Sequence, residues 1–238
     1  MATFEAQVNG LTGLGATLSG TTTPTDTELD QFLKDGVMDV TNKWMAIRPQ
    51  DANLFTKTSS EQTSNGLNIN GAHIISVVRE SGTNDDWRNC REIPPGLQSN
   101  VTDTNSLHYA SKYSPSFMIG DAGQISVFPT PGSNPDAFKV YYVNKDPVNG
   151  SGSTLLHSHD DILYFPIDKL YLVVIYAAIK SLESKLTFYT IEEEDEELVR
   201  ALQTSLQQLQ VTYNSGFLPD KNYEAALQSQ SQQRGQRA

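Results

Sequence analysis

The hydrophobic pattern predicts an amphipathic helix over residues 26–47. Apolar side chains recur there at three- and four-residue spacings, so they share one face of a helix. Thr25 and Glu28 form a capping-box sequence at its start, and Pro49 ends it. Gly36 is expected to weaken the middle of the helix by about 1 kcal/mol. The predicted core positions of this helix are Leu29, Phe32, Leu33, Val40 and Trp44.

A second helix is predicted from residue 166 to about Phe188. Its centre, Leu170 to Ile179, is an unbroken apolar run in a chain that is otherwise polar. Pro166 suits the first helical position, because the N–H that proline lacks would have no partner there. A helix that is apolar all round must be covered on all sides. Its predicted core or subunit-contact positions are Leu170, Val174, Tyr176 and Ala177.

A third helix is predicted to follow after a short turn at residues 189–190. Thr190 and Glu193 form another capping-box sequence, and the acidic residues 192–197 suit the positive end of a helix dipole. Gly216 and Pro219 are expected to end it. Its predicted core positions are Leu202, Leu206 and Leu209. The short turn makes the last two helices antiparallel neighbours in a bundle.

Two amphipathic helices are few to cover a third helix that is apolar all round. A single apolar stripe on each partner leaves part of the 166–188 helix open. We therefore expect a β-rich region of the same chain and a second copy of the chain to supply the remaining cover.

Residues 53–145 follow a different pattern, with short runs rich in β-branched and aromatic residues separated by glycine, proline, asparagine and serine. Such runs are typical of strands and turns. The stretch QISVFPTPGSNPDAFKVYYV predicts two antiparallel strands joined by a loop that contains Pro129, Pro131, Gly132 and Pro135. Residues 82–105 are predicted to be mainly loop, with one helical turn.

These patterns predict an α+β fold, an antiparallel helical bundle with a β-rich insertion between its first and second long helices. Residues 1–24 and 219–238 are poor in large apolar side chains and are predicted to be extended arms. The predicted domains are an N-terminal arm at 1–24, a bundle at 25–52 and 161–218, a β-rich insertion with a polar linker at 53–160, and a C-terminal arm at 219–238.

Composition narrows the function further. The formal net charge is −11, which argues against wrapping duplex DNA because that requires lysine and arginine. An acidic surface also suits a passage through which a polyanion slides without binding, although ordinary solubility explains the charge better when the charge is taken alone. The N-terminal residues do not resemble a signal peptide, and the charges flanking the apolar run argue against a membrane span.

Candidate chemistry is sparse. The cluster His157, His159, Asp160 and Asp161 contains metal-ligating residue types, but a solvated loop explains it better. Cys90, the only cysteine, is a weak candidate nucleophile with His73, His108 or His157 as its base. Phosphate-binding glycine motifs and the GxSxG sequence are absent. The sequence therefore predicts neither an enzyme nor a cofactor.

The order of motifs resembles the head-to-tail connector (adaptor) proteins of tailed bacteriophages, including the tail tubular A type. The resemblance covers about residues 25–215. It depends on TELDQFLKDGVMDV, then on SPSFMIGDAGQISVFPTPGSNPDAFKVYYV, and then on FPIDKLYLVVIYAAIKSLESKL. The resemblance rests on the pattern of apolar residues within these segments and on their order in the chain, and it includes no catalytic signature residues.

The resemblance implies a virion structural protein of the phage neck, assembled in the bacterial cytoplasm. Such adaptors form a ring, usually of twelve copies, beneath the portal protein and around the DNA channel, where DNA is only in passage. It implies contact of the 129–135 loop with tail proteins or neighbouring copies, and no membrane partner. It also implies a portal-binding C-terminal arm, with Tyr223, Leu227, Arg234 and Arg237 as its contacts.

Two other interpretations remain open. One is another neck or tail component, such as a tail-completion or nozzle protein. The other is a β-rich receptor-binding module, which would need a concave, aromatic-lined pocket within residues 53–145.

Overall fold

The computed structural model describes residues 2–13, 24–192 and 196–217, and it has a mixed α+β fold. The chain divides into two compact units. The helical unit comprises the described parts of residues 1–49 and 147–238, and the β unit comprises residues 50–146. The chain therefore leaves the helical unit after residue 49 and returns to it at residue 147.

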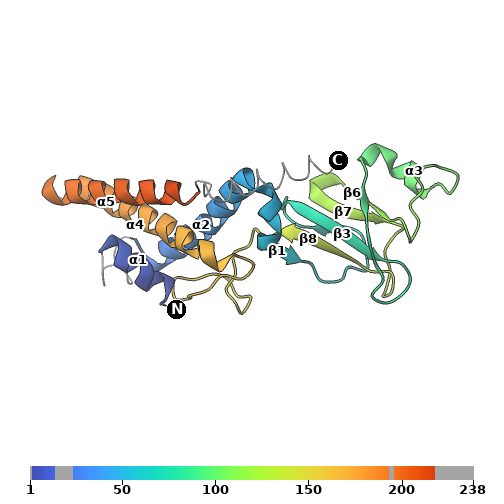
Figure 1. Cartoon of the computed structure of the whole chain (residues 1–238), viewed down its shortest axis with the longest axis horizontal. Helices are drawn as coiled ribbons and strands as arrows, with labels where there is room; N and C mark the ends of the chain where they lie inside the picture. The colour runs from blue at the N-terminus through green and yellow to red at the C-terminus, as the bar shows by residue number, and fades with distance from the viewer. Residues whose placement is uncertain (1, 14–23, 193–195, 218–238) are drawn as a thin grey trace, which may run out of the picture. The chain divides into compact units, whose positions relative to one another are not determined.

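Four helices make up the helical unit (Figure 1). They are α1 (Phe4–Thr12), α2 (Asp26–Ile47), α4 (Leu170–Glu192) and α5 (Glu196–Ser215), and the short 3-10 helix η5 (Ile167–Lys169) precedes α4. Helices α1, α2 and α5 each contact α4, which is the central helix of the unit.

The prediction for α2 is confirmed at both ends. The Thr25 hydroxyl accepts a hydrogen bond from the Glu28 N–H, and the Glu28 carboxylate accepts one from the Thr25 N–H. This reciprocal pair satisfies two N–H groups that the helix itself leaves free. The helix ends at Ile47, two residues before Pro49.

The predicted N-terminal arm is wrong for residues 4–12, which form α1 on the surface of α4. Phe4 and Val8 are completely buried, and the Thr3 hydroxyl caps the helix at Ala6. A helix this short has little intrinsic stability, so its burial of Phe4 and Val8 is what holds it. Residues 14–23 lie outside the described part of the chain.

Helix α1 also changes the expected cover of α4. Within the helical unit every residue from Leu172 to Ile175 and from Ala177 to Ile179 is buried. The α1, α2 and α5 helices supply this cover. The expectation that a second copy must cover the central apolar run is therefore wrong, because the sequence pattern did not reveal α1 as a third partner.

The boundary between α4 and α5 also differs from the prediction. Helix α4 continues through Thr190 to Glu192, so the predicted turn at residues 189–190 is wrong. Glu193, the second residue of the predicted capping box, lies outside the described residues. Glu196 and Glu197 occupy the first turn of α5, where their charges favour the helix dipole as expected. Pro166 precedes η5 as its N-cap residue, one position earlier than predicted.

Gly36 has a packing role that the sequence did not show. An added Cβ at Gly36 would lie 3.1 Å from Tyr176 Cδ1 and 3.3 Å from both Val173 Cγ1 and the Val173 carbonyl oxygen. The missing side chain therefore lets α2 approach α4 closely. This close packing offsets the conformational cost of glycine within a helix.

We expect Gly36→Val to destabilise the helical unit by about 2–3 kcal/mol, because overpacking at a close helix contact forces the helices apart. Gly10→Ala in α1 is the matched control, since nothing lies within 4 Å of an added Cβ there. The control should gain about 0.5–1 kcal/mol from helix propensity. Urea unfolding followed by circular dichroism measures both changes. Equal stability of Gly36→Val and the parent would contradict the close contact.

The β unit contains two four-stranded sheets. The first has the order β1-β8-β3-β4 and is antiparallel throughout. The second has the order β2-β7-β6-β5, in which only β5 and β6 are parallel. The strands are β1 (Thr56–Thr58), β2 (Leu67–Asn68), β3 (Ile74–Glu80), β4 (Trp87–Asn89), β5 (Arg91–Glu92), β6 (Ser116–Ile119), β7 (Gln124–Phe128) and β8 (Phe138–Val143).

The core of the β unit draws side chains from both sheets. Val77, Phe138 and Val140 of the first sheet belong to the same buried cluster as Phe117, Ile125 and Val127 of the second. The two sheets therefore share one core.

The predicted hairpin of residues 124–143 is wrong. Strands β7 and β8 form, but β7 pairs with β2 and β6 whereas β8 pairs with β1 and β3. The connection between them therefore crosses from one sheet to the other. Its three prolines lack N–H donors and are unsuited to extending a ladder from β7 into β8.

Residues 82–105 contain more structure than predicted. The expected helical turn is α3 (Gln98–Thr102), preceded by the 3-10 helix η3 (Pro95–Leu97). Strands β4 and β5 were not predicted, and they belong to different sheets although only Cys90 separates them. Two other short 3-10 helices among the described residues are η2 (Pro49–Phe55) and η4 (Asp121–Gly123).

The predicted polar linker at 146–160 packs with the helices rather than with the strands. Leu155 is completely buried, and the carbonyl groups of His157 and His159 accept hydrogen bonds from the Glu5 and Phe4 N–H groups. The predicted domain boundaries at 52 and 160 therefore move to 49 and 146. The sequence predicts a linker here because the segment is rich in glycine and serine, and its burial depends on Leu155.

Candidate functional site

The predicted core residues of the helical unit fall into two groups. Most are buried, namely Leu29, Leu33, Val40, Trp44, Leu170, Val174, Ala177 and Leu202. Four are only half-buried, namely Phe32, Tyr176, Leu206 and Leu209. The half-buried residues lie at the margins of the helix contacts, where a second surface could still reach them.

An aromatic and cationic cluster joins the end of α2 to the end of α5. The Tyr213 hydroxyl donates a hydrogen bond to Asp39, and its ring lies 5.1 Å from that of Phe217. Lys43 forms an ion pair with Asp39 at 2.8 Å and lies 4.7 Å from the Tyr213 ring centroid. Burial, followed by the hydrogen bond to Asp39, raises the pKa of Tyr213. This cluster therefore depends on a protonated tyrosine.

We expect Tyr213→Phe to cost about 1–2 kcal/mol, because it removes a hydrogen bond to a charged acceptor. The parent should also lose stability as pH rises above about 10, since the unfolded tyrosine releases its proton there and the folded one does not. Below that pH the contribution is fully present. Thermal unfolding from pH 7 to 11 measures both effects.

The control for this prediction is Tyr113→Phe, because Tyr113 is 64% exposed. It should leave both the stability and its pH dependence unchanged. A Tyr213→Phe variant with the same alkaline loss as the parent would show that another group causes it.

The residues of the candidate metal cluster have separate partners. His157 Nδ1 lies 2.9 Å from Asp30 Oδ1 of α2, and Asp161 accepts a hydrogen bond from the Gly150 N–H. His159 bonds to the Leu156 N–H and to the Asn149 side chain. Among the described residues, no three histidine, cysteine, aspartate or glutamate side chains are grouped to hold a metal ion. His157 therefore joins the 147–161 segment to α2, whereas the His159 and Asp161 side chains bond within the segment itself.

Cys90 lies in the core of the β unit with 4% of its surface exposed. Burial raises the pKa of its thiol to about 12. A nucleophilic cysteine must be accessible and must ionise to the thiolate, whereas the Cys90 thiol is buried and has a raised pKa. Cys90 therefore acts as a small apolar core residue.

The predicted contact loop is anchored by two buried charged residues that the sequence analysis missed. Arg79, 3% exposed, donates to the carbonyl groups of Pro129, Thr130 and Glu80 and pairs with Asp136 at 3.1 Å. The sequence feature that could have revealed both residues is an arginine followed by a glutamate at the end of an apolar strand.

Glu80, 1% exposed, anchors the other end of the loop. Its carboxylate accepts hydrogen bonds from the N–H groups of Asp85 and Ala137. The Asn134 amide, oriented with its NH2 group toward acceptors, donates to both carboxylate oxygens at 3.1 and 2.9 Å. These bonds give the loop a defined shape before any partner binds.

The predicted contact residues of the loop are less exposed than expected. Pro131 is buried, and Pro129, Gly132 and Pro135 are half-buried. The exposed residues of the loop are Thr130, Ser133 and Asn134. A partner that contacts this loop would therefore meet mainly polar side chains.

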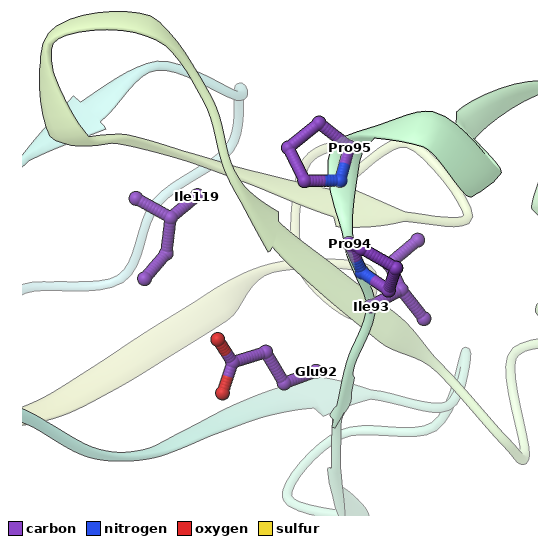
Figure 2. A pocket seen from close by; sticks show the side chains of 5 residues that line it. All are labelled: Glu92, Ile93, Pro94, Pro95 and Ile119. Carbon is purple, nitrogen blue, oxygen red and sulfur yellow. The ribbon is translucent and has the colours of Figure 1, made fainter.

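A shallow groove of about 390 Å³ lies between residues 92–95 and Ile119. Figure 2 shows Ile119 on one side and Pro94 and Pro95 on the other, with the Glu92 side chain extending between them. Ile119 is 40% exposed, which leaves an apolar wall open to solvent. The groove contains no pair of titratable side chains, so its chemistry suits contact with another molecule rather than catalysis.

No protein-family model matches this chain, and no curated protein matches it. No helix in the described residues is long and apolar enough to cross a membrane. The predicted contacts of the C-terminal arm, Tyr223, Leu227, Arg234 and Arg237, lie outside the described residues.

Proposed function

We propose that this protein is a head-to-tail adaptor of a tailed bacteriophage, a virion structural protein that forms a ring beneath the portal. In this proposal the helices form an antiparallel bundle that builds the ring and the DNA channel. Residues 50–146 are an insertion between α2 and α4 that contacts tail proteins or neighbouring copies. The acidic net charge of −11 suits a channel along which DNA passes without tight phosphate contacts.

The observation that carries the proposal is the position of the resembling motifs in the fold. The segment SFMI is strand β6, QISVF is β7, FKVYYV is β8, and LYLVVIYAAIK lies in the central helix α4. The motifs therefore supply strands to both sheets of the β unit and the buried centre of the helical unit.

Electron microscopy of the purified full-length protein, alone and mixed with portal rings, tests the proposal. Class averages should show closed rings, and the mixture should show these rings stacked on one face of the portal. Rings that bind a tail assembly but never a portal would favour a tail-completion or nozzle protein instead. A monomer under both conditions would contradict the proposal.

The C-terminal residues provide a separate prediction within this function. Deletion of residues 219–238 should leave the circular dichroism spectrum and ring assembly intact while portal binding falls at least tenfold. The expected reason is loss of Tyr223 and Leu227 as apolar contacts and of Arg234 and Arg237 as cations near acidic portal groups. Binding by the parent should weaken with salt. Unchanged portal affinity of the truncated protein would contradict this role.

A further inference from the structure

Helix α5 has two opposite faces of different composition. Its inner face is the predicted core stripe, in which Leu202 and Tyr213 are buried. At 3.6 residues per turn, a second set of residues lies on the opposite side of the helix. This outer face consists of Thr204, Gln207, Gln208, Val211 and Thr212, which line a shallow hollow of about 600 Å³.

Beyond its N-terminal end, which contains Glu197 and Arg200, the outer face of α5 carries no charge. From Ala201 to Phe217 the sequence contains no aspartate, glutamate, lysine or arginine. Val211 is 70% exposed at the centre of the face. The Thr204 and Thr212 hydroxyls already donate to carbonyl groups of their own helix, both at 2.9 Å. A helix face that only meets water normally carries charged side chains, so this face is better suited to contact with protein.

Helix α2 has a partly exposed stripe of uncharged side chains, bordered by Lys34 and Asp35. Gln31, Met38 and Met45 recur at seven-residue intervals on the side opposite the buried residues Leu33 and Val40. Met38 is 40% exposed and Met45 is half-buried, whereas the inner stripe is closed. Methionine adapts its shape to a partner and is common at protein-binding surfaces.

We propose that the outer face of α5 binds the outer face of α2 on a neighbouring copy, with Val211 packed against Met38. This inference rests on the proposed ring-forming function and names its subunit contact. The two faces lie on different helices, so the contact is heterologous and can repeat from copy to copy until a ring closes. A contact of one face with itself would stop at a dimer.

The charge distribution favours a second copy as the occupant of both faces. Each chain has a net charge of −11, so most surfaces of two copies repel each other. The α5 face carries no charge between Ala201 and Thr212, and the Gln31–Met45 stripe of α2 lies between Lys34 and Asp35, whose opposite charges offset each other. The two faces can therefore approach with little repulsion. The amides of Gln207 and Gln208 can each donate and accept hydrogen bonds at the rim, while Val211 and Met38 exclude water from the centre.

Two charge substitutions test the contact in the full-length chain. Val211→Glu and Met38→Glu each place a carboxylate at the centre of one face, at positions exposed enough to leave the fold intact. Each variant alone should lose ring assembly and have a mass near 26.2 kDa by light scattering, with an unchanged circular dichroism spectrum. A mixture of the two should form a 1:1 pair, because each copy retains the face that the other lacks.

Cysteine cross-linking gives an independent measurement, because the only native cysteine, Cys90, is buried. The double variant Val211→Cys with Met38→Cys should form a ladder of covalent multimers under mild oxidation. The single variant Val211→Cys should form no covalent multimers. The double variant Gln203→Cys with Met38→Cys is the matched control, because Gln203 lies on the side of α5, and it should form no ladder either. Covalent dimers from Val211→Cys alone would overturn the proposal in favour of an α5–α5 contact.

The outcomes separate this contact from the proposed function. If the parent forms rings and both glutamate variants still form them, the contact is wrong while the adaptor function stands. If the parent stays a monomer both alone and with a portal, the adaptor function and this contact both fail. Where the parent assembles only on the portal, the same variants are compared on the portal.

Discussion

Val174→Asp is expected to unfold the helical unit or to lower its stability by at least 3–5 kcal/mol. Val174 is 3% exposed in the centre of α4. An aspartate there would have no cationic partner on its own helix within one turn, and its carboxylate would be protonated or would draw water into the core. A loss of this size is a large part of the total stability of an ordinary domain. Urea unfolding, followed by the helical signal in circular dichroism, measures it.

Ile167→Asp is the matched control for this substitution. Ile167 is also an apolar β-branched residue, but it is 73% exposed in the short helix before α4. An aspartate near the start of a helix is favoured by the dipole, so this variant should stay within about 0.5 kcal/mol of the parent. If Val174→Asp and Ile167→Asp were equally stable, α4 would not be the core of its unit.

Arg79→Met is expected to destabilise the β unit by about 3–5 kcal/mol. Methionine fills a similar volume but donates no hydrogen bonds, so the carbonyl groups of Pro129 and Thr130 lose a charged donor. Asp136 also loses its ion pair, and the 129–136 loop should become mobile. Hydrogen exchange at the Gly132 and Asp136 amides should then rise strongly, because both are hydrogen-bonded within the folded loop.

Arg88→Met is the control, because the Arg88 side chain is 47% exposed and its ion pair with Asp86 lies at the surface. Exposed ion pairs contribute little, so the control should lose less than 1 kcal/mol. Val174→Asp and Arg79→Met can be distinguished by spectroscopy, because the two substitutions lie in different units. Val174→Asp should affect the helical signal first, whereas Arg79→Met should affect the signal of the aromatic residues in the β unit. A rigid loop in Arg79→Met would contradict the anchoring role of the arginine.

The local elements could be predicted from the sequence because their signals are local. The capping box of Thr25 and Glu28 lies within four residues, and the apolar stripe of α2 repeats within the helix itself. The run from Leu170 to Ile179 demanded burial whatever its partners, because exposed apolar surface of that extent is costly. The runs of β-branched residues predicted β3, β7 and β8, because strand propensity is also a local property of the sequence.

Candidate sites could be predicted only as residue types. The sequence placed His157 among metal-ligating neighbours, but Asp30 lies 127 positions away in the chain and takes one of its ring nitrogens. Arg79 and Glu80 were missed because their partners are the backbone and side chains of residues 129–137, some fifty positions further along. No local pattern records which distant group a charged side chain will meet.

The sequence by itself determined that α2, α4 and α5 form, that residues 53–145 are rich in strands, and that the centre of α4 is buried. The tertiary structure decided that α1 covers the remaining side of α4, and that β7 and β8 join different sheets. It also decided that Gly36 is a site of close helix contact rather than only a weak point in α2. The physical reason is the same in each case: periodicity and capping act between residues close in the chain, whereas the choice of packing partner depends on surfaces that only the folded chain brings together.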